Sequence, residues 1–508
     1  MKLARRKFLR VGASGMALVA TAGCDQRGLP RELRQLLALA QPRGGSFQAP
    51  AADTIDPIIH ALNRAGFGPR PGDYQRVQQL AKSPEDAAAA YLERQLQPES
   101  IQDDEADYAA RRFETLQEPA GEMFEYQPDL LQNELIRATL TRAVLSERQL
   151  FEVMVEFWSD HFNIDPSKGD CKWLKPIDDR EVIRQHALGK FADLLRASAL
   201  SPAMLWYLDG RVNRRATGTD KPNENYAREL LELHTLGVHG GYTQKDVMEA
   251  ARCLTGWTVR STVSPPYFQV GKVEFDPALH DFGAKTILSQ NVPATDTTLA
   301  KEVLERRGRQ ELDTVLGIVA AHPATARHIG AKLCRHFIAD APPAAAVAAV
   351  SEAFTKTAGD IRETLRALFR TEAFLLTRGN KLKRPFSFII SALRATGART
   401  DCGSEIVDYL KRMGHAPFNY PTPEGYPDQA TPWMGTLLWR WNFAVALSQN
   451  QIKGTCVELE VLRESAGGDA RLMAHLLGRK PHPAEAQAFA DSGDGLALIL
   501  ASPAFQWC

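Results

Sequence analysis

Apolar residues recur at helical spacing through nearly all of the chain after residue 52, and this periodicity constrains the fold most. Five segments show the pattern most clearly, each with a polar start and a glycine or proline stop. They span residues 130–145, 147–163, 178–197, 222–236 and 244–256. The sequence therefore predicts a mainly α, multi-helix globular protein.

One region departs from this pattern and predicts a small β-hairpin insert. Short runs of β-branched and aromatic residues, 267–270 and 273–275, flank Pro265, Pro266 and Gly271. The organisation predicted for the mature chain is an N-terminal helical region with the candidate site, the hairpin insert with a loop, a helical subdomain, and a loop-rich and helical C-terminal region. These parts span residues 53–258, 259–297, 298–400 and 401–508.

The first 24 residues predict export. A basic start is followed by a short apolar stretch from Val11 to Ala22, as in a signal peptide, and Arg5 with Arg6 resembles a twin-arginine signal. We expect a periplasmic or secreted protein. Residues 21–24 also resemble a lipoprotein processing site, which leaves open a lipid anchor at Cys24, and residues 25–52 have the composition of a tether.

The charge balance and the cysteine content limit the kinds of partner and metal site that this chain can have. The formal net charge is zero, so no long-range field steers a polyanion, and we expect no nucleic-acid partner. Six cysteines follow Cys24 without a CxxC pair, which argues against a zinc-ribbon cluster. One or two disulfides and buried free thiols fit these six residues equally well. No later apolar segment is long enough to span a bilayer.

The segment 223–236, here the Asn-Glu-Asn helix, is the richest in candidate functional groups. A helical wheel places six residues in one arc: Glu224, Asn225, Arg228, Glu229, Glu232 and Thr235. Spacings of three and four let Asn225, Glu229 and Glu232 converge, so that one glutamate serves as acid, base or oxygen ligand. The alternative is a solvated face in which Glu224 and Arg228 form an ordinary ion pair. His234 points to the other side, as a core histidine does.

Three further places offer chemistry. His161 ends a strongly apolar helix, where a side chain acts as a ligand or caps the last carbonyls. His280 and Asp281 share a loop, where they supply a metal ligand or base, or simply make a turn. A short basic linker separates Asp209 from the Asn-Glu-Asn helix. If this region is functional, we expect Asp209 to fold back beside the helix as a further acidic group. The chain has no GxSxG, Walker, HExxH or CxxCH motif.

The chain resembles the bacterial exported domain-of-unknown-function family 1800 over nearly the whole mature sequence. The resemblance rests on motifs in the same order: residues 60–68, 157–162, 201–204, 207–209, the Asn-Glu-Asn helix and 280–281. It implies secretion, often with a twin-arginine signal. It also implies an exported partner from family 1501, which resembles the alkaline phosphatase superfamily. The resemblance to this family does not imply any particular activity.

The leading hypothesis is an exported enzyme of unknown reaction, a metal-dependent hydrolase or an oxidoreductase. Its catalytic residues are expected to be Asp209, Asn223, Asn225, Arg228, Glu229 and Glu232, and its metal ligands His161, His280 and Asp281. The cofactor is unknown; a divalent transition metal such as zinc, manganese, iron or copper suits these ligands. The rival is a non-catalytic scaffold or partner-binding subunit. A third alternative is a cofactorless hydrolase with a glutamate pair acting on a polymer such as a glycan.

Overall fold

The computed structural model describes residues 45–508 apart from residues 216, 218–220 and 262–268. The predicted signal peptide (1–24), Cys24, the tether up to residue 44 and the 267–268 part of the predicted hairpin lie outside the described residues. Within the described part, helices dominate and the strands form three short antiparallel pairs. The prediction of a mainly α fold with a small hairpin element is confirmed. Every helix of these described residues is too short or too polar to cross a membrane.

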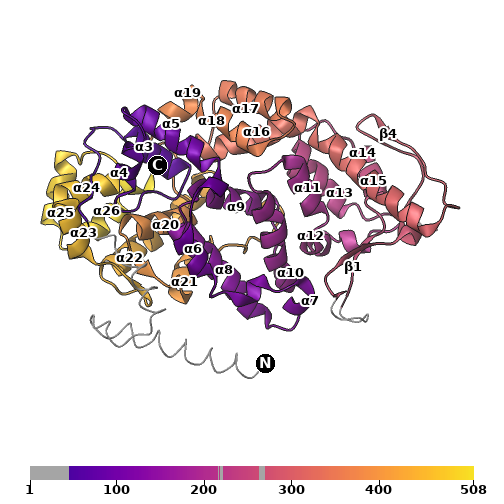
Figure 1. Cartoon of the computed structure of the whole chain (residues 1–508), viewed down its shortest axis with the longest axis horizontal. Coiled ribbons are helices and arrows are strands. Elements are labelled where there is room, and N and C mark those ends of the chain that lie inside the picture. The colour runs from indigo at the N-terminus through magenta and orange to yellow at the C-terminus, as the bar shows by residue number, and fades with distance from the viewer. Residues whose placement is uncertain (1–44, 216, 218–220, 262–268) are drawn as a thin grey trace.

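The first and last helices of the described chain lie together at one end of the elongated molecule (Figure 1). Backbone hydrogen bonds join them: Phe47 N–H donates to the Ser465 carbonyl at 2.9 Å, and Asp56 N–H to the Gly478 carbonyl at 3.1 Å. The early helices are α3 (Pro57–Arg64), α4 (Asp73–Gln78), α5 (Pro84–Gln95), α6 (Asp104–Ala110) and α7 (Ala120–Met123). The late elements are α21 (Ser404–Arg412), η9 (Thr431–Thr436), α22 (Leu437–Ser448), α23 (Leu459–Ala466), α24 (Asp469–Leu477), α25 (Pro483–Asp491), α26 (Gly495–Ala501) and α27 (Pro503–Gln506).

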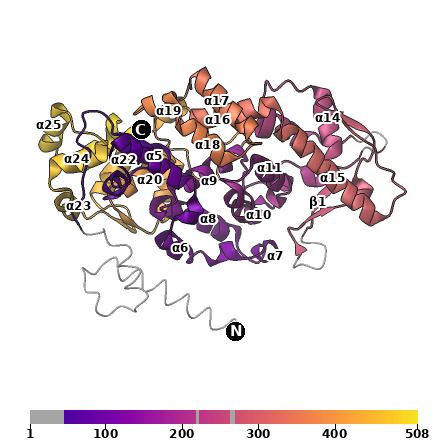
Figure 2. The same ribbon diagram turned by 45° about the horizontal axis from the view of Figure 1, so that its top comes forward.

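The middle of the molecule is built around α8 (Pro128–Leu145) and α9 (Gln149–His161), which both ribbon views place centrally (Figure 2). They match the helices predicted for residues 130–145 and 147–163. The helices that follow are α10 (Cys171–Ile177), η4 (Asp178–Arg184), α11 (Phe191–Ala199), α12 (Pro202–Tyr207), α13 (Asn225–Leu231), η6 (Glu232–Leu236) and α14 (Gln244–Cys253). Four short 3-10 turns are η2 (Pro98–Ser100), η3 (Glu114–Gln117), η5 (Gly210–Val212) and η8 (Pro277–Leu279).

Two of the predicted regular helices contain π-helical turns in the structure. The segment 178–197 starts as the π-helix η4, breaks at a turn in which Gly189 N–H donates to the His186 carbonyl at 2.9 Å, and resumes as α11. The Asn-Glu-Asn helix ends in the π-helix η6, where the Thr235 hydroxyl donates to the Leu230 carbonyl at 2.6 Å. The π-helical turn shifts side chains from the positions that a regular wheel gives.

Two hairpins follow α14 at the far end of the molecule. Strands β1 (Trp257–Val259) and β2 (Val273–Phe275) pair with Trp257 opposite Phe275. Strands β3 (Lys285–Ile287) and β4 (Gln290–Val292) are joined by Leu288 and Ser289, both with positive φ, as a tight two-residue turn requires. A third pair, β5 (Arg399–Thr400) with β6 (Thr455–Cys456), was not predicted.

The remaining helices complete one continuous core. They are α15 (Lys301–Ala320), α16 (Pro323–Phe337), α17 (Ala344–Lys356), α18 (Ile361–Phe369), α19 (Glu372–Leu376) and α20 (Pro385–Ala395). A single hydrophobic cluster extends from Phe47 to Phe505 and includes residues of all four predicted parts of the mature chain. The six cysteines after Cys24 are all unpaired thiols, five of them buried. The alternative of buried free thiols is therefore the one that the structure shows.

Candidate functional site

Helix α9 is largely apolar but carries three acidic residues at four-residue spacing, Glu152, Glu156 and Asp160, of which Glu152 pairs with Arg184 at 3.0 Å. Its residues Met154 and Trp158 are fully buried in the core. Glu156 and Asp160 are four residues apart, so their carboxylates project from the same face. Only 13 % of the Glu156 side chain and 19 % of the Asp160 side chain are exposed. Carboxylates with so little access to water need a compensating charge.

The compensating charge is Arg384, which immediately precedes α20. Its guanidinium lies 3.0 Å from Oε1 of Glu156 and 2.7 Å from Oδ2 of Asp160. A third carboxylate, Oδ1 of Asp428, lies 3.8 Å from the same guanidinium. The Arg384 side chain is 5 % exposed. Three carboxylates therefore share one buried cation.

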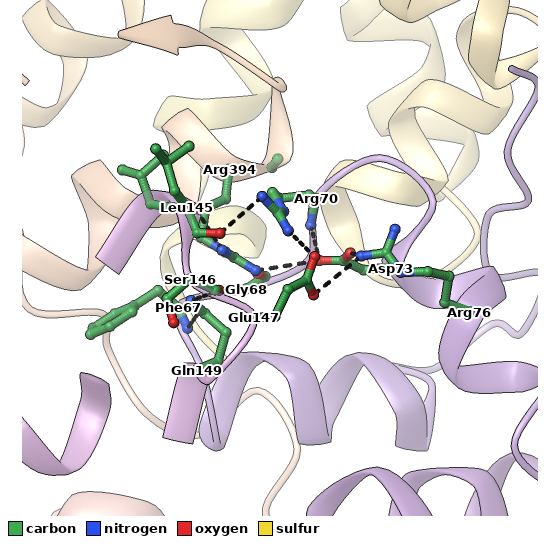
Figure 3. A network of polar contacts seen from close by, with 12 residues as sticks. Phe67, Gly68, Arg70, Asp73, Arg76, Leu145, Ser146, Glu147, Gln149 and Arg394 are labelled. Atoms are coloured by element: carbon green, nitrogen blue, oxygen red, sulfur yellow. Dashed lines mark hydrogen bonds and ion pairs between the residues drawn. The ribbon is translucent and has the colours of Figure 1, made fainter. Parts of the chain in front are cut away.

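Helix α20 is fixed against the rest of the protein at both ends, which positions Arg384. At its C-terminal end, the buried Arg394 donates to the carbonyls of Gly68 and Val144 at 2.8 and 2.6 Å. Arg394 also lies 3.3 Å from Asp73, within an ionic network that includes Arg70 (Figure 3). A helix held by an arginine at each end leaves little freedom for either guanidinium to move.

The ionic contacts continue to α16 and to the loop before α20. Asp428 accepts a hydrogen bond from Nδ1 of His336 at 2.9 Å. Lys381 donates to Asp340 at 2.6 Å and to the Asp428 carbonyl at 2.7 Å. Burial opposes the ionisation of Asp428, but His336 and Arg384 outweigh it and hold the pKa of this carboxyl well below its usual range. We call Glu156, Asp160, Arg384, Asp428, His336 and His415 the Arg384 cluster.

His415 faces Glu156 with a defined tautomer. Its Nδ1 accepts the backbone N–H of Phe386, in the first turn of α20, at 3.2 Å. Since a backbone N–H can only donate, the proton of the neutral ring is on Nε2. Nε2 lies 4.0 Å from Oε1 of Glu156. The imidazole packs between Tyr426 and Trp433, with ring centroids 4.4 and 4.9 Å away.

A small cavity of about 30 Å³ opens between Glu156 and His415. It is lined by Thr139, Val155, Glu156, Ser159, Asp160, Asn163, Phe386, His415, Pro417, Phe418 and Tyr426. Among the described residues, the buried Oγ of Ser159 has no hydrogen-bond partner, and the buried Oε1 of Glu156 is held only by its ion pair with Arg384 at 3.0 Å. A cavity of this size has room for about two water molecules. Its polar wall, with a carboxylate and a hydroxyl oxygen, makes it suitable for water or a small reacting group.

The two α9 carboxyls have raised pKa values. Burial raises the pKa of Glu156 to about 7, with Arg384 opposing and Asp160 adding to the increase. Burial likewise raises the pKa of Asp160, with Arg384 again opposing. Because two carboxyls share one arginine, one proton can be shared between them. A carboxyl that titrates near neutral pH can both take and give a proton under physiological conditions.

Residues 414–433, here the aromatic loop, cover the cavity. The Asn163 side-chain amide donates to the carbonyls of Tyr420 and Thr422 at 2.9 and 2.8 Å. On the other side of the loop, the Tyr207 hydroxyl donates to the Pro421 carbonyl at 3.0 Å. Phe418, in the cavity wall, has a φ of 61°, a strained conformation for an aromatic residue. These bonds hold a strained loop over the acidic pair, as a lid.

The aromatic loop approaches the end of α9 so closely at residue 425 that this residue must be a glycine. A Cβ at Gly425 would lie 2.0 Å from the Asp160 carbonyl oxygen, and Gly425 has a φ of 72°. We expect Gly425→Ala to lower the free energy of unfolding by about 2 kcal/mol and to loosen the loop, since backbone cannot yield to the new methyl group. Urea denaturation and limited proteolysis within residues 414–433 measure both effects.

Gly435→Ala is the matched control, because a Cβ there meets no atom of the described residues within 4 Å and its φ is not positive. It should change neither stability nor proteolysis. Equal effects of the two substitutions would contradict the close docking of the loop on α9.

The structure brings three of the predicted catalytic residues together. The Asn223 side chain accepts the backbone N–H of Asn225 at 2.9 Å, and the Asn225 amide donates to Asp209 at 3.2 Å. Asp209 also forms an ion pair with Lys168 at 3.0 Å and has a φ of 60°. The predicted return of Asp209 to the Asn-Glu-Asn helix is thus present. This cluster is partly exposed, and its bonds fix the start of α13.

The other three predicted catalytic residues lie further along the same helix. Arg228 contacts Glu224 and Gln244, each at 3.1 Å, so the ordinary ion pair that was left open does form. Glu232 accepts the Tyr242 hydroxyl at 2.9 Å. Burial raises the pKa of the half-buried Glu229, and Glu232 and Glu424 add to the increase. Glu424 belongs to the aromatic loop, which therefore extends from the Arg384 cluster to this helix.

His161, predicted as a metal ligand, is fully engaged by the protein. Nδ1 accepts from the ammonium of Lys332 at 2.9 Å, and Nε2 donates to the carbonyl of His234 at 3.1 Å. Burial, then Lys332 and the neighbouring histidines, hold the His161 pKa well below its usual value. Neither ring nitrogen offers a free lone pair in this arrangement. His234 is fully buried, as the wheel predicted.

His280 and Asp281 lie in a different part of the molecule, against α14 and α15. Nδ1 of His280 donates to the Thr255 carbonyl at 2.7 Å, and Nε2 lies 3.4 Å from Glu311. Asp281 receives two hydrogen bonds from Arg252, at 2.7 and 3.1 Å. The contacts of His280 are thus separate from those of His161 with Lys332 and His234.

Among the described residues, a different trio meets the geometric condition for a metal site. Ligand atoms of Glu156, Asp160 and His415 all lie within 4.8 Å of one another. Their chemistry fits a cation poorly, since Nε2 of His415 carries the proton and Arg384 already binds both carboxylates. A shared proton suits the trio better than a divalent metal.

Comparison with curated proteins and with solved structures finds no significant match. A family model, described as a protein of unknown function, matches residues 60–507. The match contains α9, α20 and the aromatic loop, and so all of the Arg384 cluster. The chain therefore belongs to the DUF1800 family.

Proposed function

We propose that this protein is an exported hydrolase that activates water by general acid–base catalysis at Glu156. One observation carries the proposal: Oε1 of Glu156, which is ion-paired with Arg384 at 3.0 Å, lies 4.0 Å from Nε2–H of His415 across a small cavity. Two groups at that separation can both hydrogen-bond a single water molecule at about 2.8 Å. The imidazole would donate to the water oxygen, and the ionised Glu156 would accept the water proton.

The surrounding residues support this role. A general base works best when its pKa lies near the working pH, and burial raises the pKa of Glu156 to about 7. Arg384 and Asp160 tune that value in opposite directions. Phe386, Phe418 and Tyr426 limit access of bulk water to the cavity. After attack by the water, protonated Glu156 would return its proton to the leaving group.

Export through the twin-arginine route, to the periplasm or outside the cell, is part of the proposal and rests on residues 1–24. A lipid anchor at Cys24 would keep the enzyme at the membrane surface. The trio Glu156, Asp160 and His415 favours a second candidate, a metal-dependent hydrolase or oxidoreductase. That candidate requires the loss of the Nε2 proton of His415 and the displacement of Arg384.

A non-catalytic subunit, acting with an exported partner similar to the alkaline phosphatase superfamily, is the rival to both. In that case the Arg384 cluster only fixes the packing of α9 against α20. Substitutions in the cluster would then lower stability without removing any chemistry. The test therefore has to measure activity and stability on the same variants.

We expect the protein to hydrolyse at least one substrate in a chromogenic panel. The panel contains carboxylate esters, phosphate esters, sulfate esters and glycosides. Glu156→Gln should lower that rate about 100-fold, since it removes the base and keeps the shape. Because the base acts when ionised, the wild-type rate should rise with pH through about 7, the pKa of Glu156.

Glu460→Gln is the control, since the Glu460 side chain is 76 % exposed and remote from the cavity. If Glu156→Gln kept the wild-type rate and pH profile, Glu156 would not be the catalytic base, and the reactive centre would lie elsewhere in the protein. If Glu156→Gln changed the stability, and neither wild type nor the variants hydrolysed any substrate, the non-catalytic subunit would be favoured.

A further inference from the structure

A second cavity, of about 40 Å³, is lined by Arg384, shares Glu156 with the first cavity, and has an unusual excess of positive charge. Its charged lining residues are Arg64, His336, Lys381, Lys383, Arg384, Glu156 and Asp428. Four of these carry a permanent or near-permanent positive charge and two a carboxylate. Such an imbalance inside a protein is costly unless something negative offsets it.

Lys383 is the cation with the least compensation. It is 6 % exposed, and its ammonium donates to the Ser391 hydroxyl at 2.8 Å. The Phe505 ring lies 4.0 Å from the ammonium, but among the described residues no carboxylate lies within ion-pair distance of it. The fully buried Arg440 donates to the Lys383 carbonyl at 2.8 Å and adds positive charge nearby. Burial lowers the pKa of Lys383 to about 8, with Cys508 partly opposing and Arg440 adding to the decrease, so the ammonium is still mostly charged at neutral pH.

Arg64 is a second buried cation without a carboxylate within ion-pair distance among the residues that the structure describes. It is 8 % exposed. Its guanidinium donates to the carbonyls of Phe337 and His336, at the end of α16, and lies 3.2 Å from Sγ of Cys508. The partial negative charge of a helix C-terminus offsets only part of a full positive charge.

The other two cations of the cavity already have acidic partners. Lys381 pairs with Asp340, and Arg384 with Glu156 and Asp160. The unmatched charge is therefore that of Lys383 and Arg64, which line the same space. The first turn of α20 adds the positive end of an 11-residue helix, with the half-buried Ser387 facing the cavity.

We infer that this cavity is a binding site for a small oxyanion, a phosphate or sulfate group, held by Lys383, Arg64 and Ser387. Tetrahedral oxyanions accept several charge-assisted hydrogen bonds at once, and this cavity presents an ammonium, a guanidinium and a hydroxyl. The proposed anion ligands are distinct from the water-activation residues, since Lys383 and Arg64 do not line the Glu156–His415 cavity, although Glu156 lines both cavities. The oxyanion is either free in solution or the terminal group of a larger ligand.

Calorimetric titration of the full mature chain with inorganic phosphate, and separately with methyl phosphate, tests the inference in a buffer without other oxyanions. We expect saturable 1:1 binding of inorganic phosphate and a rise in Tm. Lys383→Met should weaken binding roughly tenfold or more, because it removes a charged donor and keeps the side-chain length. Lys480→Met, at a side chain that is 66 % exposed, is the charge-matched control and should bind as wild type does.

Ser387→Glu provides a second variant that remains informative if Lys383→Met does not fold. Its carboxylate would enter the cavity from the third position of α20, supply the missing negative charge, raise Tm and abolish phosphate binding. Tighter binding of methyl phosphate would identify a larger phosphorylated ligand, and tighter binding of inorganic phosphate a free anion. No binding of either anion by wild type, or binding unchanged in both Lys383→Met and Ser387→Glu, would overturn the inference.

Discussion

Arg384→Met will lower the free energy of unfolding by about 4 kcal/mol, since it leaves buried carboxylates without their cation. Glu156, Asp160 and Asp428 all lie within 4.0 Å of this guanidinium. Methionine keeps much of the side-chain volume, so the loss reports mainly on charge. Urea denaturation at neutral pH measures it.

Two further variants separate charge from packing in this experiment. Arg196→Met removes an ion pair with Asp313 of 2.7 Å, but both side chains are about half exposed, so we expect a loss below about 1 kcal/mol. Adding Glu156→Gln and Asp160→Asn to Arg384→Met should restore part of the stability, because it removes the unpaired charges. A loss for Arg384→Met no larger than that for Arg196→Met would contradict the shared-cation arrangement.

The free energy of unfolding of wild type, relative to that of Glu156→Gln, will fall as pH rises. Burial raises the folded-state pKa of Glu156 from an ordinary value of 4.5 to about 7, so the folded protein holds a proton that the unfolded chain releases. This contribution is fully present below pH 4.5 and is lost as pH rises through about 7. The expected loss is about 3 kcal/mol across this window.

Denaturant unfolding of both proteins at several pH values between about 5 and 8 measures this difference, with Glu460→Gln as the exposed control. The Glu460→Gln curve should run parallel to that of wild type. A difference between wild type and Glu156→Gln that grows with pH, or does not change, would mean that Glu156 is ionised in the folded protein throughout.

The helical architecture was predictable because apolar periodicity reflects which face of each helix the core buries. It located α8, α9 and α14 to within a few residues. It could not locate the π-helical turns in η4 and η6, because their wider hydrogen bonding is fixed by tertiary contacts and by side chains such as Thr235. The pair β5–β6 joins segments more than fifty residues apart, which no local pattern indicates.

The candidate site was harder to predict than the fold. Asp209, Asn223 and Asn225 do meet, as their spacing suggested, but Glu156 was missed. One local signal could have indicated it: acids repeated every four residues on a largely apolar helix, here Glu152, Glu156 and Asp160, are costly to bury without partners. The partners Arg384, His415 and Asp428 come from distant segments, and only the fold brings them to α9.

The expected metal ligands illustrate the same limit. His161 and His280 look alike in sequence, each next to an aspartate. In the structure, His161 contacts Lys332 and His234, whereas His280 contacts Thr255 and Glu311. Which nitrogen of a histidine is free depends on such partners and not on the neighbouring residues in the chain.

Infrared difference spectroscopy of wild type against Glu156→Gln, followed through a pH titration, tests the central claim most directly. We expect the C=O stretching band of a protonated carboxylic acid in wild type at mildly acidic pH. It should be absent from the variant and should disappear with a midpoint near the Glu156 pKa of about 7. A wild-type spectrum that already shows only carboxylate at mildly acidic pH would contradict Glu156 as the acid–base group of this site.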